Sequence, residues 1–235
     1  MTPITDLITG FPLFGVCLTL LAFYIGQIIY QRSGNFALFQ PVVTGLLLVI
    51  ACLIIFDIPY SRYYSSSLVL HSLLGPATVA LAIPLFQNAK RIRELFLPIL
   101  CTVLVGGTLT IIIALAVLWM FDASSITMLS MAPKSITTPI AMIVSEHIGG
   151  LPALSALFVL VTGAIGAMVG IPILNAINIE DDGVKGFTMG LTSHAIGTAR
   201  SLEESPECAA FSALAMGLTG VATALLLPVA VALLI

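Results

Sequence analysis

The sequence predicts an all-α, polytopic membrane protein. Its composition and the length of its apolar runs both support this prediction. Of the 235 residues, 59% are hydrophobic and only 8% are charged, whereas soluble domains hold about 25% charged residues. The mean hydropathy is +1.16. Apolar runs of about 20 residues recur along the chain, which is the length of a membrane-spanning helix, and the alternating ten-residue segments of a membrane β-barrel are not seen.

The apolar runs predict about eight helical segments. In chain order they are 11–30, 36–56, 72–87, 95–121, 125–150, 152–177, 186–202 and 209–235. The third is interrupted by Gly75, Pro76 and Pro84, and the fifth and seventh carry polar groups. Short or Gly/Pro-interrupted segments are typical of the discontinuous helices of transporters. We therefore expect two or three of the eight segments to be broken or re-entrant.

Small residues mark how the sixth segment packs. Gly163, Gly166 and Gly170 recur at spacings of three and four residues, which predicts a smooth stripe that contacts a neighbouring helix. We expect one integral membrane domain over residues 1–235. A weak similarity between 36–48 and 152–164 suggests two halves, 1–121 and 122–235, of an inverted-repeat transporter.

Several classes of function are excluded by what the chain lacks. The net charge of −3 and the dispersed basic residues do not suit a nucleic-acid partner. The four cysteines show no C-x-x-C spacing and the three histidines show no ligand spacing, so we expect neither a metal nor a cofactor. The G-x-S-x-G, H-E-x-x-H and Walker motifs do not occur, which predicts that the protein is not an enzyme.

The fifth segment holds a cation and hydroxyl groups where lipid would be expected. Its candidate binding residues are Lys134, Ser135, Thr137, Thr138 and Pro139. A charge at bilayer depth costs at least about 3 kcal/mol, and Pro139 would free the carbonyl of Ser135 from a helix. We expect these groups to face a cavity that holds an anion. The alternative is that Pro133 begins a helix and Lys134 extends toward the membrane surface while the hydroxyls serve helix contacts.

The seventh segment carries a second polar group. Ser193, Gly197 and Arg200 lie at i, i+4 and i+7 of a helix, with His194 and Thr198 on the adjacent strip. The guanidinium of Arg200 matches a carboxylate in two hydrogen bonds, and His194 can carry a proton near neutral pH. The alternatives are an Arg200 paired with Glu203 or Glu204 at the membrane boundary, and a His194 that is simply buried and hydrogen-bonded.

These segments resemble the LrgB/CidB membrane family. The resemblance rests on Pro-Lys-Ser-Ile-Thr-Thr-Pro-Ile-Ala at 133–141, Ile-Gly-Gly at 148–150 with Pro-Ala at 152–153, Ser-His-Ala-Ile-Gly-Thr-Ala at 193–199, and the Gly-Pro-Ala-Thr motif that opens 75–85. It implies a bacterial inner-membrane protein with a smaller, holin-like partner of the LrgA/CidA type. The family is described both as antiholin-like regulators of murein hydrolase activity and as carriers of small carboxylates. A plastid relative moves glycolate and glycerate, and bacterial relatives are linked to pyruvate.

We therefore expect a transporter component for small monocarboxylates such as pyruvate, glycolate or glycerate, embedded in a lipid bilayer as a homo- or hetero-oligomer. Arg200 or Lys134 would hold the carboxylate, and His194 is the candidate proton group. Substrate oxygens would bind Ser135, Thr137, Thr138 and Thr198, and the interrupted third segment would add Thr78. The alternative is an antiholin-like regulatory subunit that controls murein hydrolase activity and autolysis, in which the polar segments serve helix association.

Overall fold

The computed structural model describes residues 11–34 and 36–234, and within these ranges the chain forms helices and no strand, which confirms the all-α fold class. The helices form two compact units, one ending at Ala80 and the other beginning at Leu81. This division differs from the repeat halves that meet at residues 121 and 122, and the two-fold repeat stays a prediction.

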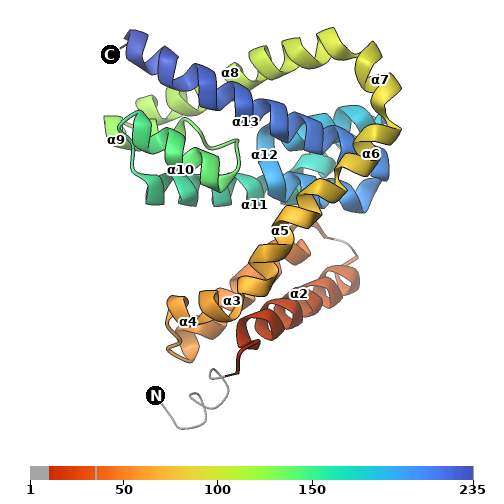
Figure 1. The fold of residues 1–235 in the computed structure, drawn as a ribbon, viewed down its shortest axis with the longest axis vertical. Helices are drawn as coiled ribbons and strands as arrows, with labels where there is room; N and C mark the ends of the chain where they lie inside the picture. Colours follow the sequence, from red (N-terminus) through yellow and green to blue (C-terminus); the bar gives the residue numbers. More distant parts are fainter. Residues whose placement is uncertain (1–10, 35, 235) are drawn as a thin grey trace. The chain divides into compact units, whose positions relative to one another are not determined.

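The first unit is built around a close pair of helices. Its elements are α2 (Phe14–Arg32), η1 (Ala37–Phe39), α3 (Pro41–Ile55), α4 (Tyr60–Ser66) and α5 (Leu68–Ala80). A Cβ atom added at Gly26 would lie 3.0 Å from the carbonyl oxygen of Pro41, and one at Gly45 would lie 3.2 Å from Cα of Phe23. The two glycines thus let α2 and α3 lie side by side along their length (Figure 1).

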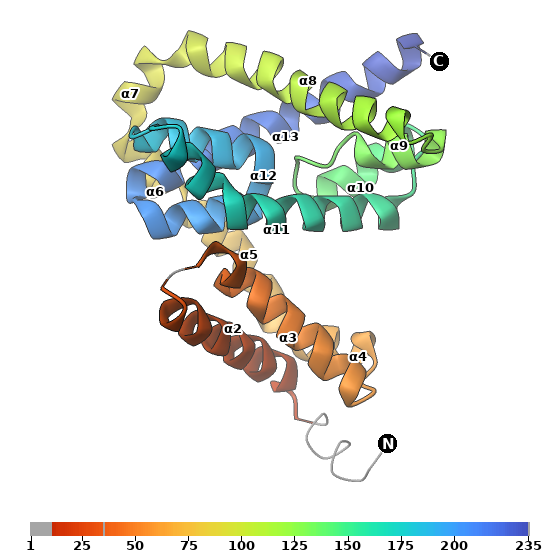
Figure 2. The same cartoon turned by 180° about the vertical axis from the view of Figure 1, so that it is seen from behind.

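The second unit places a broken helix between two long ones. Its elements are α6 (Ala82–Gln87), α7 (Ala89–Glu94), α8 (Phe96–Met120), α9 (Ser125–Met131), α10 (Thr138–His147), α11 (Pro152–Ala176), α12 (Asp182–Glu204) and α13 (Pro206–Leu234). Helix α12 packs against both α11 and α13, as Figure 2 shows from behind. The polar seventh segment is therefore enclosed by protein on two sides.

Five helices of the described chain are long and apolar enough to cross a membrane. They are Phe14–Arg32, Leu68–Gln87, Phe96–Met120, Pro152–Ala176 and Pro206–Leu233, with Pro41–Ile55 as a shorter apolar helix. The chain is a multi-pass membrane protein. The third segment is interrupted as expected, but at Leu81, three residues before Pro84. Gly75 and Pro76, which were also expected to interrupt it, lie inside α5. Proline inside an apolar helix is tolerated where other groups satisfy the freed backbone.

The glycine stripe of α11 is confirmed as a helix-contact surface. A Cβ atom on Gly163 would lie 2.7 Å from Cε1 of His194, one on Gly166 would overlap the side chain of Ser193, and one on Gly170 would overlap the sulfur of Met189. All three contacts are to α12. The stripe therefore fixes the position of the broken helix and, with it, of His194.

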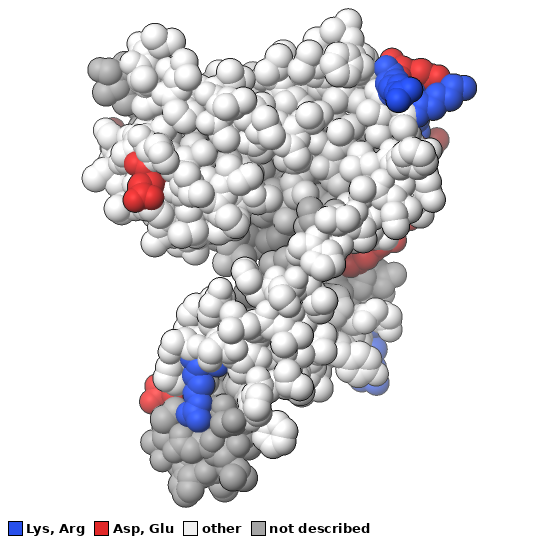
Figure 3. All heavy atoms as spheres, in the orientation of Figure 1, with Lys and Arg blue, Asp and Glu red and all other residues white. Residues whose placement is uncertain are grey.

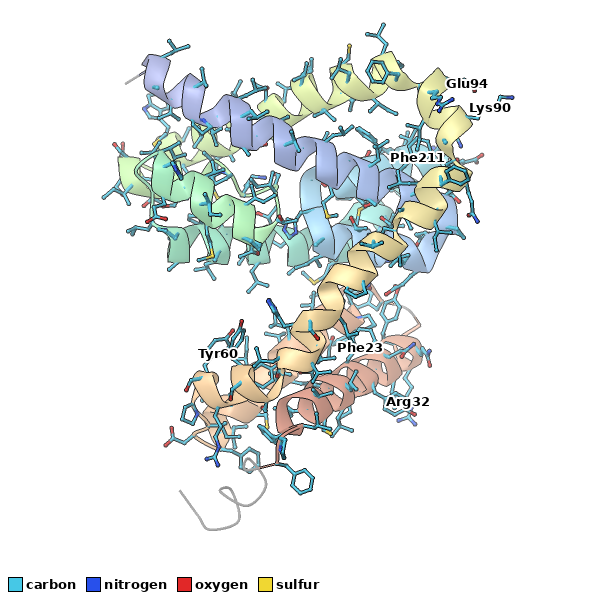
Figure 4. All side chains as sticks on the ribbon, viewed as in Figure 1. Phe23, Arg32, Tyr60, Lys90, Glu94 and Phe211 are labelled. Carbon is cyan, nitrogen blue, oxygen red and sulfur yellow. The ribbon has the colours of Figure 1, made fainter. Side chains whose placement is uncertain are left out.

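Charged groups tie one end of this unit together. Arg91 on α7 forms an ion pair of 2.5 Å with Asp181 and another with Glu207 at the start of α13. Its guanidinium also lies 5.4 Å from the ring centre of Phe211, which Figure 4 labels below α7. Figure 3 shows charged side chains gathered around α7, whereas the surface over α8 and α13 is uncharged.

Asp181 gives a first testable prediction. Its side chain caps α12 by accepting a hydrogen bond of 2.9 Å from the N–H of Val184, and this bond, together with Arg91, lowers the pKa of the carboxyl. We expect Asp181→Ala to lower the melting temperature by about 2–4 °C, since an N-cap is worth about 1 kcal/mol. Asp181→Asn keeps a capping oxygen, so we expect it to lower the melting temperature by less.

The stabilisation by the Asp181 carboxylate should depend on pH, and this dependence tests its role. Because the pKa is lowered on folding, the stabilisation is present above the ordinary pKa of about 3.9 and is lost as the pH falls through the lower, folded value. Melting curves in detergent at neutral and acidic pH measure both effects. If the difference in melting temperature between wild type and Asp181→Ala does not become smaller at acidic pH, the carboxylate does not have this role.

Candidate functional site

The fifth segment is broken at the polar residues. Helix α9 ends at Met131 and α10 begins at Thr138, and the link between them turns through hydrogen bonds from the N–H of Lys134 to the carbonyl of Met131 (3.0 Å) and from the N–H of Ile136 to the carbonyl of Pro133 (3.3 Å). Irregular backbone at membrane depth is found only where protein or water surrounds it. The link meets this condition because most of it is buried.

The two prolines act differently from the expectation. Pro133 is fully buried in the turn after α9 and does not begin a helix. Pro139 lies in the first turn of α10, where a missing N–H costs no helical hydrogen bond. The expectation that Pro139 frees a helical carbonyl of Ser135 is therefore wrong, because the helix starts only after Ser135. The proline helps to set where α10 begins.

Lys134 is the central cation of this link. Its Nζ atom lies 3.2 Å from Oγ of Ser135, and within the described chain no carboxylate forms an ion pair with it. It lines a groove of about 370 Å³ whose other walls are Met131 and the α8 residues Thr110, Ile113, Ala114, Val117 and Leu118. A half-buried ammonium without a carboxylate beside it is suited to an anionic ligand.

The start of α10 adds positive character to the link. Thr137 is the N-cap residue, with extended φ and ψ of −64° and 142°, and its hydroxyl makes no capping hydrogen bond. The first N–H groups of a helix lack partners and carry a partial positive charge. Thr137 and Thr138 are half-buried and Pro139 is exposed. Thr138, the first residue of α10, comes four residues after Lys134. The ammonium and the positive end of the helix therefore belong to one short segment.

The seventh segment is also broken, at His194. This residue has φ 43° and ψ −133° inside α12, a conformation that costs about 1–3 kcal/mol in a non-glycine residue. The bend brings Gly197 so close to the first half of α12 that an added Cβ would lie 2.5 Å from the carbonyl oxygen of Met189. The single helical face that the spacing of Ser193, Gly197 and Arg200 predicted is therefore wrong, since the bend falls between Ser193 and the other two.

Buried hydrogen bonds hold the bend. Nε2 of His194 lies 3.0 Å from the carbonyl oxygen of Val159 on α11, and the hydroxyl of Thr198 lies 2.9 Å from the hydroxyl of Ser212 on α13. Ser193, His194 and Thr198 are each at most 3% exposed. No pattern in the sequence singles out Ser212, which is one of many small residues in an apolar run. Its part in the site follows from the packing of α12 on α13.

The structure brings some of the candidate residues together and separates others. The groove that Lys134 lines is formed by α8 and α9 and holds no described residue of α12, while His194 is bonded to α11, so a site shared by the two broken segments stays a prediction. Arg200 forms the ion pairs that the alternative predicted, with Glu203 at 3.3 Å and Glu204 at 2.5 Å. Thr78 belongs to α5 in the other unit, and its side chain lies outside the part of the chain that the structure describes.

The chain is similar over most of its length to known proteins. The LrgB-like family matches residues 19–233. A protein named "Holin-like protein CidB" from Staphylococcus epidermidis is 32% identical over 214 residues, which cover 91% of this chain and 93% of that protein. A protein named "Antiholin-like protein LrgB" from Bacillus cereus is 30% identical over 217 residues, covering 92% and 94%. No solved structure matches the chain.

Proposed function

Because the chain belongs to the LrgB-like family, we propose that it acts in a bacterial inner membrane in the holin- or antiholin-like role that its relatives' names describe. The observation that carries this proposal is similarity over nine-tenths of the chain to proteins with those names. In this role the protein would be the regulatory subunit of a holin-like membrane partner of the LrgA/CidA type. Its activity would set the extent of murein hydrolysis and autolysis.

A second candidate function is favoured by the geometry of the two broken segments. We propose that they bind a small monocarboxylate and carry it across the membrane. Lys134, with no carboxylate paired to it in the described chain, supplies one positive charge, and the N-terminus of α10 adds N–H donors. One cation suits a monoanion such as pyruvate, glycolate or glycerate better than a dianion, because a second carboxylate would remain unpaired at membrane depth.

The other candidate residues take roles around Lys134. Ser135, Thr137 and Thr138 offer hydroxyls along the same link and would bind the remaining oxygens of the acid. Ser193, His194, Gly197 and Thr198 hold the bend of α12. His194 is the proposed proton carrier because an imidazole titrates near neutral pH and this residue sits, with a strained backbone, at the bend of α12. Movement of the α12 bend would then change access to the site.

Uptake into proteoliposomes separates the two candidate functions. The full chain is reconstituted alone and with an LrgA/CidA-type protein, and uptake of labelled pyruvate, glycolate and glycerate is followed. Saturable uptake in either preparation supports the carrier. No uptake in both preparations overturns it and leaves the regulatory role, whose own measurement is the rate of autolysis in cells that lack or overproduce the protein.

Arg200 provides a sharper prediction within the carrier candidate. Its two terminal nitrogens already pair with Glu203 and Glu204, so we propose that Lys134, and not Arg200, holds the carboxylate. Arg200→Lys keeps the charge and loses the two-pronged geometry. We expect the half-saturation concentration for uptake to change by less than about twofold. A tenfold or larger increase in the half-saturation concentration would mean that Arg200 binds the carboxylate.

A further inference from the structure

Both ends of helix α12 lie at the same end of the second unit. Arg91 on α7 forms ion pairs with Asp181, the residue that caps the start of α12, and with Glu207 in the first turn of α13. Helix α12 lies between these two acids in the chain, so its first and last turns are both held beside α7. A straight helix of its 23 residues would have its ends about 35 Å apart. Helix α12 therefore enters the membrane and leaves it through one face.

The bend at His194 is the deepest point of α12. A Cβ atom on Gly170 would overlap the sulfur of Met189, and one on Gly163 would lie 2.7 Å from Cε1 of His194. The first half of α12 therefore runs antiparallel to α11. Gly163 lies about 17 Å from the start of the 25-residue helix α11 and about 20 Å from its end. The bend is thus halfway along a helix that is long enough to cross the membrane.

The other broken segment enters from the opposite face. Helix α8 follows α7 and extends for 25 residues, about 37 Å, and α11 has the same length and ends five residues before Asp181. The chain between α8 and α11 therefore begins and ends away from α7. Within it, the N–H of Leu151 donates a hydrogen bond of 2.8 Å to the hydroxyl of Ser130 on α9. Figures 1 and 2 show α7 and α9 at opposite ends of α8.

The link between α9 and α10 also reaches the middle of the unit. A Cβ atom on Gly220 would lie 3.5 Å from Cδ1 of Ile140 in the first turn of α10. Gly220 is the central residue of the 29-residue helix α13. Ile136 of the link belongs to the same buried apolar cluster as Val159, whose carbonyl lies 3.0 Å from Nε2 of His194. Both breaks therefore lie near half depth, and each is carried by two short limbs.

The elements of the second unit repeat in reversed direction. A full-length helix followed by a broken, re-entrant one occurs first as α8 with α9 and α10, and then as α11 with α12. Helix α8 runs away from α7 and α11 runs back toward it, so the two hairpins open at opposite faces. These repeats, 96–147 and 152–204, differ from the halves 1–121 and 122–235 that the sequence suggested. Transporters use inverted repeats with broken helices to expose a midplane site to each face in turn.

Basic residues assign the two faces. Short loops on the cytoplasmic side of a membrane protein carry an excess of Lys and Arg. The second unit, residues 81–235, holds six Lys and Arg residues, and all except Lys134 lie on α7 or near the two ends of α12. These five are Lys90, Arg91, Arg93, Lys185 and Arg200. The face at α7 is therefore the cytoplasmic one.

We propose that the second unit is a pair of inverted repeats whose hairpins open to opposite sides, α12 to the cytoplasm and α9–α10 to the outside. The link at Lys134 and the bend at His194 are then approached from different faces, and movement of either hairpin changes access from its own side. This gating role rests on the carrier candidate above. The placement of the hairpins does not, because it follows from contacts within the unit.

Single cysteines on either side of each hairpin test the placement. In a chain whose four native cysteines are replaced by alanine, the substitutions are made at exposed residues: Ser125→Cys and Glu146→Cys for α9–α10, and Glu180→Cys and Glu203→Cys for α12. Each variant is treated with a membrane-impermeant maleimide in right-side-out and in inside-out vesicles. We expect the first two to be labelled only in right-side-out vesicles and the other two only in inside-out vesicles. Any other pattern overturns the proposal.

The wild-type chain allows a second measurement that needs no substitution. Lys90 is exposed and Lys185 partly so, and an impermeant amine reagent followed by mass spectrometry shows from which side each is modified. We expect both to react only in inside-out vesicles, and modification from opposite sides contradicts the proposal. Neither measurement depends on uptake. The expected labelling in a protein that takes up no pyruvate, glycolate or glycerate would therefore exclude the carrier function and leave the placement of the hairpins intact.

Discussion

Gly190→Ala is expected to destabilise the protein by about 3 kcal/mol, enough to remove most of the folded material from the membrane. A Cβ atom at this position of α12 would overlap the carbonyl oxygen of Ser212 and lie 2.9 Å from its Cα. The obstacle is backbone inside α13, which no side-chain rotation relieves. Because α12 packs on α13 along much of its length, the strain would reach the bend at His194. Yield and melting temperature in detergent measure the effect.

Gly217→Ala is the matched control for this substitution. Gly217 lies on α13, and an added Cβ would meet nothing within 4 Å. Since glycine in a helix costs up to about 1 kcal/mol relative to alanine, we expect Gly217→Ala to melt at the same temperature as wild type or slightly higher. Equal melting temperatures for the two variants would mean that α12 and α13 do not pack as closely as their glycines indicate.

Lys134→Gln is expected to have the largest effect on transport. If the ammonium binds the carboxylate of the substrate, its loss removes a charge-assisted hydrogen bond worth about 1.5–3 kcal/mol, which corresponds to a 10- to 150-fold rise in the half-saturation concentration. Glutamine keeps a polar group of similar length, so the link between α9 and α10 should fold as before. Initial uptake rates in proteoliposomes over a range of substrate concentrations give the comparison.

Lys90→Gln is the control for Lys134→Gln. Lys90 is an exposed basic residue on the short helix α7, so its removal changes the net charge equally without touching the Lys134 groove. We expect its uptake to match wild type. Uptake by Lys134→Gln that also matches wild type would exclude Lys134 as the anion ligand, even if the wild-type protein proves to be a carrier.

Local sequence determined the fold class and the position of the break in the fifth segment. A lysine, three hydroxyls and two prolines between 133 and 139 cannot continue an apolar spanning helix without a cost, and the link after α9 falls there. The glycines of α11 likewise marked a contact stripe, because their spacing follows the helical period. Composition and apolar run length were enough to predict a multi-pass, all-helical membrane protein.

The tertiary structure decided which neighbour each polar group meets. His194 turns the chain because α11 offers the carbonyl of Val159 and the space above Gly163, and this bend separates Ser193 from Arg200. Arg200 pairs with its own helix end, whereas Lys134 has no carboxylate within reach in the described chain. Local sequence fixes backbone preference and the periodicity of polar faces, but hydrogen bonds and ion pairs between helices depend on contacts across tens of residues. Those contacts exist only once α11, α12 and α13 have packed.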